Sequence, residues 1–225
     1  MIKSLLKFSV LKVKGRSIAI DDAVNDMVLL GLFIRNSIGI LRGFIRCRSF
    51  ILIGRSVILR SKDNIKLGKG VTIGDYSTLD ALGVHGLCIG SSSSIGAFSI
   101  LKVSGTLTSV GKKIHIGKNV GIGEFAHIGG AGGVVIGDDT IVGPYFSVHP
   151  ENHNYGDLNI PIRLQGVNRQ AISIGSNCWI GAKVTVLDGA KIGNGCVVAA
   201  GAVVKGIFPD NVIIGGVPAK IIKSR

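Results

Sequence analysis

Aromatic residues, prolines and paired cysteines are all scarce in this chain of 225 residues. Phe, Trp and Tyr make up 5% of the sequence and there are 5 prolines, whereas 46% of the residues are hydrophobic. This hydrophobic content excludes a disordered chain, despite 34 glycines. The few prolines exclude collagen. The four cysteines (Cys47, Cys88, Cys178 and Cys196) form no C-x-x-C pair, so we expect reduced thiols.

The N-terminal region lacks a recognisable targeting segment. Lysines 3, 7, 12 and 14 interrupt its apolar residues, so a secretory signal peptide is not expected. The longest purely apolar run nearby covers residues 27–34, far short of the roughly 20 residues that a membrane-spanning helix needs. These features predict a cytoplasmic protein.

What the chain does contain is a six-residue period. Leu, Ile or Val occupies nineteen positions in this register, and glycine follows twelve of them directly. The positions are 67, 73, 79; 89, 95, 101, 107; 116, 122, 128; 136, 142, 148; and 174, 180, 186, 192, 198, 204. A period of six fits neither a helix nor an alternating strand.

This period predicts a parallel β-helix built from hexapeptide repeats, with three short strands in each coil of about 18 residues. The aliphatic residues would point inward. The glycines would relieve crowding at the corners and adopt unusual turn dihedrals. A Gly-rich β-sandwich is the alternative, and nineteen aliphatic residues in one register disfavour it.

The repeat is interrupted in several places. Small slips occur near residues 80–88, 108–115 and 129–135, and a large gap separates Val148 from Ile174. The gap contains two His, two Pro, two Arg and one Tyr. A polar excursion from a regular solenoid predicts a functional loop, here at 149–171.

Residues 1–50 differ from the repeat domain at 51–225. Apolar residues at helical spacing predict a short helical segment between residues 20 and 48, where single arginines interrupt them. Residues 1–60 carry eleven Lys and Arg against three Asp, a net charge of +8, while residues 61–225 carry +5. The segment is either a helix that caps the open end of the β-helix or a basic amphipathic surface that touches an anionic membrane. Nucleic-acid binding is not expected, because aromatic residues do not interleave with the basic ones.

Residues 142–225 resemble the hexapeptide-repeat acyltransferases, especially the maltose and galactoside O-acetyltransferases and bacterial polysaccharide O-acetyltransferases. The resemblance rests on three strings: HPENHNYGDLNIPIRLQG (149–166), IGSNCWIGAKVTVLDGAKIGNGCVVAAGAVV (174–204) and FPDNVIIGGVPAKIIK (208–223). It implies a left-handed β-helix and a homotrimer with active sites between subunits. It also implies transfer of an acetyl group from acetyl-CoA to a sugar acceptor, with no metal.

A sugar hydroxyl needs a general base, and histidine suits this role near neutral pH. The resemblance places the base at His153, with His149 as the second candidate and His127, in a context similar to that of serine acetyltransferases, as the third. His85 and His115 are expected to be ordinary solvent-facing residues. Asn152, Tyr155 and Glu124 are the candidate acceptor-binding residues, and Asp138 and Glu151 are further candidate acidic partners.

The resemblance also implies a set of acetyl-CoA contacts. Small residues would let the pantetheine arm approach the backbone, and lysines would face the phosphates. The matching residues are Trp179, Ala182, Ala200, Lys205, Gly206, Lys220 and Lys223. One departure is Ala131, which stands where the sugar O-acetyltransferases have an acidic acceptor-binding residue.

We therefore expect an O-acetyltransferase that acts on a sugar of a cell-surface polysaccharide or its precursor, with a contact to the inner face of the membrane. The alternatives are an amino-sugar N-acetyltransferase or a serine acetyltransferase. A γ-type carbonic anhydrase would need three histidines on one zinc ion, for which His127, His149 and His153 are the candidates. A non-enzymatic β-helix would need a regular array of residues such as Thr in place of the irregular loop.

Overall fold

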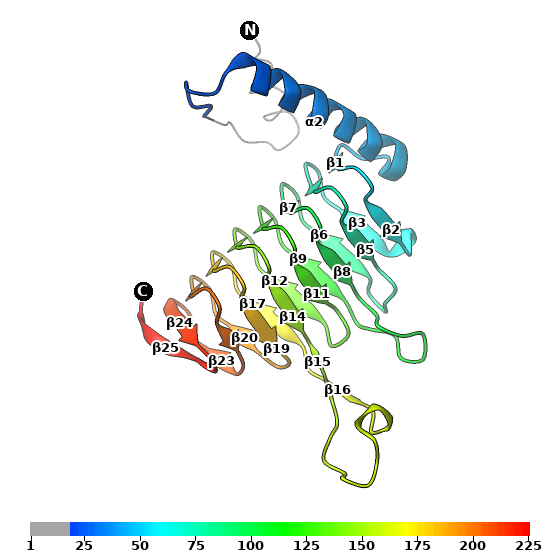
Figure 1. The fold of residues 1–225 in the computed structure, drawn as a ribbon, viewed down its shortest axis with the longest axis vertical. Coiled ribbons are helices and arrows are strands. Elements are labelled where there is room, and N and C mark those ends of the chain that lie inside the picture. The colour runs from blue at the N-terminus through cyan, green and yellow to red at the C-terminus, as the bar shows by residue number, and fades with distance from the viewer. Residues whose placement is uncertain (1–18) are drawn as a thin grey trace.

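The computed structural model describes residues 19–225, which form one helix and a left-handed parallel β-helix (Figure 1). The predicted fold class is confirmed. The helix, α2, covers Asp26–Cys47. The predicted N-terminal segment, residues 1–50, includes residues 1–18, which lie outside the described residues.

Three parallel sheets make the walls of the β-helix. Sheet A contains β1 (Leu52–Ile53), β4 (Thr72–Ile73), β7 (Ser94–Ile95), β10 (Gly121–Ile122), β13 (Ile141–Val142), β18 (Trp179–Ile180), β21 (Val197–Val198), β24 (Val212–Gly216) and the antiparallel β25 (Ala219–Ser224). Sheet B contains β2 (Ile58–Arg60), β5 (Thr78–Asp80), β8 (Ile100–Lys102), β11 (His127–Gly129), β14 (Ser147–His149), β19 (Thr185–Leu187) and β22 (Val203–Val204). Sheet C contains β3 (Ile65–Leu67), β6 (Leu87–Ile89), β9 (Ile114–Ile116), β12 (Val134–Ile136), β17 (Ile172–Ile174), β20 (Lys191–Ile192) and β23 (Ile207–Phe208).

The aliphatic register fills the interior of these coils. Seventeen of the nineteen positions are buried, and Leu67 is partly buried against the same core. Leu107 is the exception, with 82% of its surface exposed. Its predicted inward position is wrong because the chain leaves the coil after β8 and returns only at β9. Leu107 lies in this insertion, where the six-residue period no longer applies.

The glycines that follow the inward residues serve close approach and not unusual dihedrals. A Cβ on Gly96 would lie 2.4 Å from the backbone nitrogen of Glu124 in the next coil. None of the twelve has a positive φ. The left-handed turn positions lie three residues after the inward residues. Glycine takes this position at Gly70, Gly195 and Gly201, and larger residues take most of the others, such as Phe98 (φ 58°) and Asn119 (φ 54°). The expectation about turn dihedrals is therefore wrong, and the expectation about crowding is right.

Helix α2 begins at an Asn25 cap, whose side chain accepts a hydrogen bond from the backbone N–H of Val28. Its Gly43 packs so closely on the first coil that a Cβ would lie 2.1 Å from the carbonyl oxygen of Ile51. Arg42 and Arg46 donate to the carbonyl groups of Ile53 (3.4 Å) and Val57 (2.8 Å). These contacts satisfy acceptors on the first coil, where a β-helix otherwise exposes a sheet edge.

The apolar run at residues 27–34 suggested that the N-terminal region is too short to span a membrane, and the structure corrects this. By length and composition, α2, with 22 residues, is long and apolar enough to cross a membrane. Single arginines divide the apolar residues in the sequence, so no long uninterrupted run appears. Core helices of soluble proteins can have the same length and composition. These features by themselves therefore do not make α2 a membrane span.

The insertions between strands gather at the corner between sheets B and C. The loops at 81–86, 103–113 and 130–133 all lie there, as does the longest insertion, 150–171. This last segment contains an antiparallel pair, β15 (Glu151–His153) and β16 (Val167–Arg169). It also holds a short 3₁₀ turn, η2 (Ile162–Leu164); another, η1 (Lys62–Asn64), lies in the first coil. Figure 1 shows 150–171, called the arm below, projecting from the solenoid.

Candidate active site

Two histidines and a serine meet on the outer face of sheet B. Strands β11 and β14 are neighbours, and His127 lies opposite Ser147. Because Val148 points into the core, Ser147 and His149 both face outward. The rings of His127 and His149 stack with centroids 5.7 Å apart, and Ser147 Oγ lies 2.6 Å from His149 Nε2. The parallel register of the coils thus builds an imidazole pair from residues 22 positions apart.

The surroundings of His127 favour its neutral form. Partial burial lowers the pKa of His127 below its usual value, and the nearby His149 and Lys102 lower it further. A neutral imidazole has a free nitrogen lone pair that can accept a proton. The pair is therefore suited to proton transfer near neutral pH.

The arm carries His153 and is fastened at its base by an ion pair. Glu151 lies opposite Arg169 across the β15–β16 pair, with Arg169 Nε donating to Glu151 Oε2 over 2.6 Å. Farther out, Asn154 Nδ2 donates to the carbonyl oxygen of Gln165 over 3.0 Å. The Gln165 side chain in turn donates to two carbonyl groups within the arm, both over 2.7 Å. The arm is thus internally hydrogen-bonded.

Arg169 also joins the arm to the loop at 103–113. Its guanidinium donates to Ser109 Oγ (2.9 Å), to the Ser109 carbonyl (3.2 Å) and to the Val110 carbonyl (3.3 Å). The sequence analysis missed this residue, because nothing in the repeat register relates position 169 to position 109. The one available signal was that Arg169 is one of two arginines in the polar gap between Val148 and Ile174.

The structure places three of the predicted site residues on the arm. His153 lies opposite Val167 at the end of the β15–β16 pair, Asn152 opposite Asn168, and Tyr155 follows with 69% of its surface exposed. Within residues 19–225, no side chain forms a hydrogen bond or ion pair with the His153 imidazole. His149 lies four residues earlier, in the sheet B cluster.

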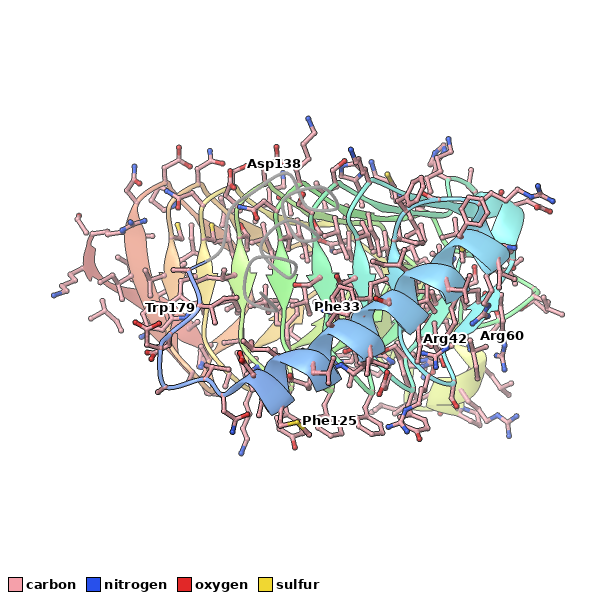
Figure 2. All side chains as sticks on the ribbon, turned by 90° about the horizontal axis from the view of Figure 1, so that it is seen from above. Phe33, Arg42, Arg60, Phe125, Asp138 and Trp179 are labelled. Carbon is pink, nitrogen blue, oxygen red and sulfur yellow. The ribbon has the colours of Figure 1, made fainter. Side chains whose placement is uncertain are left out.

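The candidate acidic residues are scattered. Glu124 precedes Phe125 at the corner between sheets A and B, on the opposite long edge from Asp138 (Figure 2). Asp138 accepts a hydrogen bond from the backbone N–H of Lys118 over 2.7 Å, and Glu151 is engaged by Arg169. The structure therefore does not bring Glu124 or Asp138 to the arm.

The predicted acetyl-CoA residues lie in the later coils. Trp179 faces outward from sheet A with 57% of its surface exposed (Figure 2). Ala182 and Ala200 occupy the same corner of successive coils, where Gly201 N–H donates to the Ala182 carbonyl over 2.9 Å. Lys205 and Gly206 lie between β22 and β23, and Lys220 and Lys223 lie on β25. Within one chain, Trp179 and the histidine pair stand on different sheets.

Residues 171–206 match the family described as bacterial transferase hexapeptide (six repeats). The matched residues run from just before β17 to just after β22. The predicted resemblance is confirmed, and the matched residues begin just after the arm and include the coil of Trp179.

Two curated relatives share part of the sequence of this chain. One is WbbJ of Escherichia coli K12, named as a candidate lipopolysaccharide biosynthesis O-acetyltransferase, which is 42% identical over 108 residues. The other is the galactoside O-acetyltransferase of Escherichia coli K12, 34% identical over 95 residues. The matches cover 44% and 40% of this chain, and 54% and 43% of the relatives. The chain thus spans about half the length of these relatives.

A solved structure shares the fold. It is a variant of AntD, an N-acyltransferase from Bacillus cereus, in complex with dTDP-4-amino-4,6-dideoxyglucose and coenzyme A. The TM-score is 0.53 at 23% sequence identity, with 78% of this chain and 80% of that chain covered. This likeness supports the β-helix architecture of the chain.

The remaining sequence expectations concern a metal and the acceptor pocket. Residues 19–225 contain no group of three His, Cys, Asp or Glu side chains that would hold a metal ion. The zinc arrangement considered for a γ-type carbonic anhydrase is therefore not formed within the described part of one chain. Ala131 is 8% exposed and its carbonyl accepts from the Lys112 N–H, so this position offers the acceptor no acidic group.

Proposed function

We propose that this protein is an acetyl-CoA-dependent O-acetyltransferase that acts on a sugar hydroxyl of a cell-surface polysaccharide or its precursor. The observation that carries the proposal is the arm with His153, which leaves the solenoid immediately before the coils that match the transferase hexapeptide family. The names of the two relatives, both O-acetyltransferases, support the reaction class.

The proposed chemistry uses histidine as a general base. The imidazole of His153 would take the proton of the sugar hydroxyl while the hydroxyl oxygen attacks the thioester carbonyl carbon. A backbone N–H would stabilise the negative charge on the carbonyl oxygen. As the carbon–sulfur bond breaks, the same imidazolium would return its proton to the departing thiolate. His149, held by Ser147, is the second candidate for this base.

The predicted acetyl-CoA residues fit this reaction. Acetyl-CoA would supply the acyl group, and its pantetheine arm would lie along Trp179 and the small corner residues Ala182 and Ala200. Lys205, Lys220 and Lys223 are all exposed and would face its phosphates, with Gly206 giving access to the backbone.

A homotrimer would complete the site. Trp179, the proposed acetyl-CoA contact, lies on sheet A, whereas the histidine pair lies on sheet B. Within one chain the acetyl-CoA contact and the imidazoles are therefore apart. In a trimer, sheet A of one subunit can approach the arm of its neighbour. We further propose a cytoplasmic enzyme, where acetyl-CoA and sugar precursors are available.

The test is release of CoA thiol from acetyl-CoA with a panel of nucleotide sugars, amino sugars and oligosaccharides. We expect His153→Ala to lower the rate about 10²–10⁴-fold with the accepted sugar. His115→Ala, on the exposed face of sheet C, is the matched control and should retain full activity. If His153→Ala kept full activity and His149→Ala lost activity, the general base would be His149 on sheet B. Transfer to an amine alone would establish the N-acetyltransferase instead.

A further inference from the structure

The outer face of α2 is apolar, and no part of residues 19–225 covers it. Residues at successive spacings of three or four form one stripe, called the outer stripe: Met27, Leu30, Ile34, Ile38, Leu41 and Ile45, exposed by 77, 38, 50, 45, 58 and 69%. The opposite face contains the buried Leu29, Gly39 and Gly43. A contiguous exposed apolar surface on a protein marks a site of contact with another protein, a ligand or a membrane. Among the described residues, the first coil packs only against the face with Leu29, Gly39 and Gly43.

An aromatic pair extends this surface at the end of the helix. Phe44 and Phe50 are exposed by 53% and 60%, and their ring centroids lie 5.9 Å apart. Exposed aromatic and aliphatic side chains on an amphipathic helix are typical of segments that lie at a lipid–water interface.

After Asp26, the charge along the helix and the first coil has one sign. Residues 27–61 contain six arginines and no Lys, Asp or Glu. Arg35 and Arg42, seven residues apart, follow the same flank of the helix. No carboxylate within residues 19–225 pairs with Arg35 or Arg48. Such a surface is complementary to the phosphates of anionic lipids, which attract basic residues close to a membrane.

We propose that α2 lies in the plane of an anionic phospholipid bilayer, with the outer stripe inserted among the acyl chains and the exposed Arg35 and Arg48 at the headgroups. This interfacial position is favoured over a span because Arg35 and Arg42 stand in the middle of the helix, where a spanning helix would bury them. In Figure 1 the arm projects from the side of the molecule away from α2. The membrane-bound protein would thus present His153 to the aqueous side. The inference does not depend on acetyl transfer.

The experiment is sedimentation of the full chain with vesicles of phosphatidylcholine alone or mixed with phosphatidylglycerol. We expect binding only to the mixed vesicles, weakened by added salt. The triple variant Ile34→Asn, Ile38→Asn, Leu41→Asn should bind at least about tenfold more weakly, because it loses the inserted aliphatic groups. The matched control is Leu158→Asn with Leu164→Asn, which removes exposed apolar side chains from the arm and should bind normally.

A second readout does not depend on loss of binding. Trp179 is the one tryptophan in the chain, so Ile38→Trp in a Trp179→Phe background reports on α2 alone. We expect its emission to shift to the blue with phosphatidylglycerol vesicles. No shift and no sedimentation would overturn the proposal. Resistance to alkaline carbonate would indicate a span, and a dimer that the triple variant abolishes would show that a second copy covers the stripe; either result also overturns it.

Discussion

Arg169 donates to Glu151 over 2.6 Å, and this contact closes the base of the arm that presents His153. The same guanidinium holds Ser109 and Val110 on the neighbouring loop. One side chain therefore links two insertions that are sixty residues apart in sequence. The position of the proposed base depends on this link and not on the repeat itself.

Removing this link should loosen the arm. We expect Arg169→Gln to speed amide hydrogen exchange in β15, β16 and the loop at 103–113, because Glu151 loses its cationic partner in a partly buried setting. Arg169→Lys should restore part of the protection, since lysine keeps the charge but cannot form all the hydrogen bonds. Arg60→Gln is the control, because its ion pair with Asp80 is long (4.0 Å) and Arg60 is mostly exposed. Unchanged exchange in Arg169→Gln would contradict the positioning role.

The lowered pKa of His127 predicts a stability change with pH. In the unfolded chain His127 takes up a proton near its usual pKa of about 6.5, whereas the folded protein resists this until a lower pH. Above that pH range His127 is neutral in both the folded and the unfolded chain. The free energy of unfolding should therefore fall as the pH drops through the range. Urea unfolding at neutral and mildly acidic pH measures the effect. His127→Gln should show a smaller fall, and an equal fall would assign the effect to other groups.

A glycine after an inward aliphatic residue should not tolerate a side chain. In Gly96→Ala the new Cβ would meet the backbone of Glu124 at 2.4 Å, and we expect a loss of about 1–3 kcal/mol in the free energy of unfolding from overpacking. Gly31→Ala on α2 meets nothing within 4 Å, and should be neutral or stabilise by about 0.5–1 kcal/mol. Urea unfolding of the two variants should give effects of opposite sign, or at least one large and one negligible loss.

Four aromatic rings stack along the corner between sheets A and B. Tyr76, Phe98, Phe125 and Tyr145 have successive centroid distances of 5.2, 5.1 and 5.0 Å, and all have positive φ. Each residue takes the same left-handed position in its own coil, so the coil spacing sets the ring spacing. The ring contacts help to offset the cost of that backbone conformation.

This stack predicts a sizeable effect of one truncation. Phe98→Ala should destabilise the protein by about 1–3 kcal/mol, because it loses two ring contacts worth about 0.5–1.5 kcal/mol each and keeps the strained backbone. Phe98→Gly should lose less, since glycine adopts positive φ freely. Leu107→Ala, at a residue 82% exposed, should change stability by no more than about 0.5 kcal/mol. Equal melting of Phe98→Ala and Leu107→Ala would show that the stack contributes nothing.

Spacing in the sequence predicted the coils well because the inward direction of each aliphatic side chain is set by its place in the local six-residue repeat. The aliphatic register, the helix near residues 20–48 and the insertions near 80–88 and 108–115 all appear in the structure. The same reasoning failed at Leu107, since a local count carries no information about where an inserted loop returns to the core.

The sequence by itself determined a β-helix with a histidine-bearing loop ahead of its transferase-like repeats. Tertiary structure alone decided which side chains meet. Stacking of β11 on β14 brings His127 to His149, and a shared corner brings Arg169 to Ser109, while Trp179 is left on another sheet. The physical reason is that contacts between coils depend on which strands are neighbours. The length of each insertion shifts this strand pairing along the sequence, while the six-residue period stays the same.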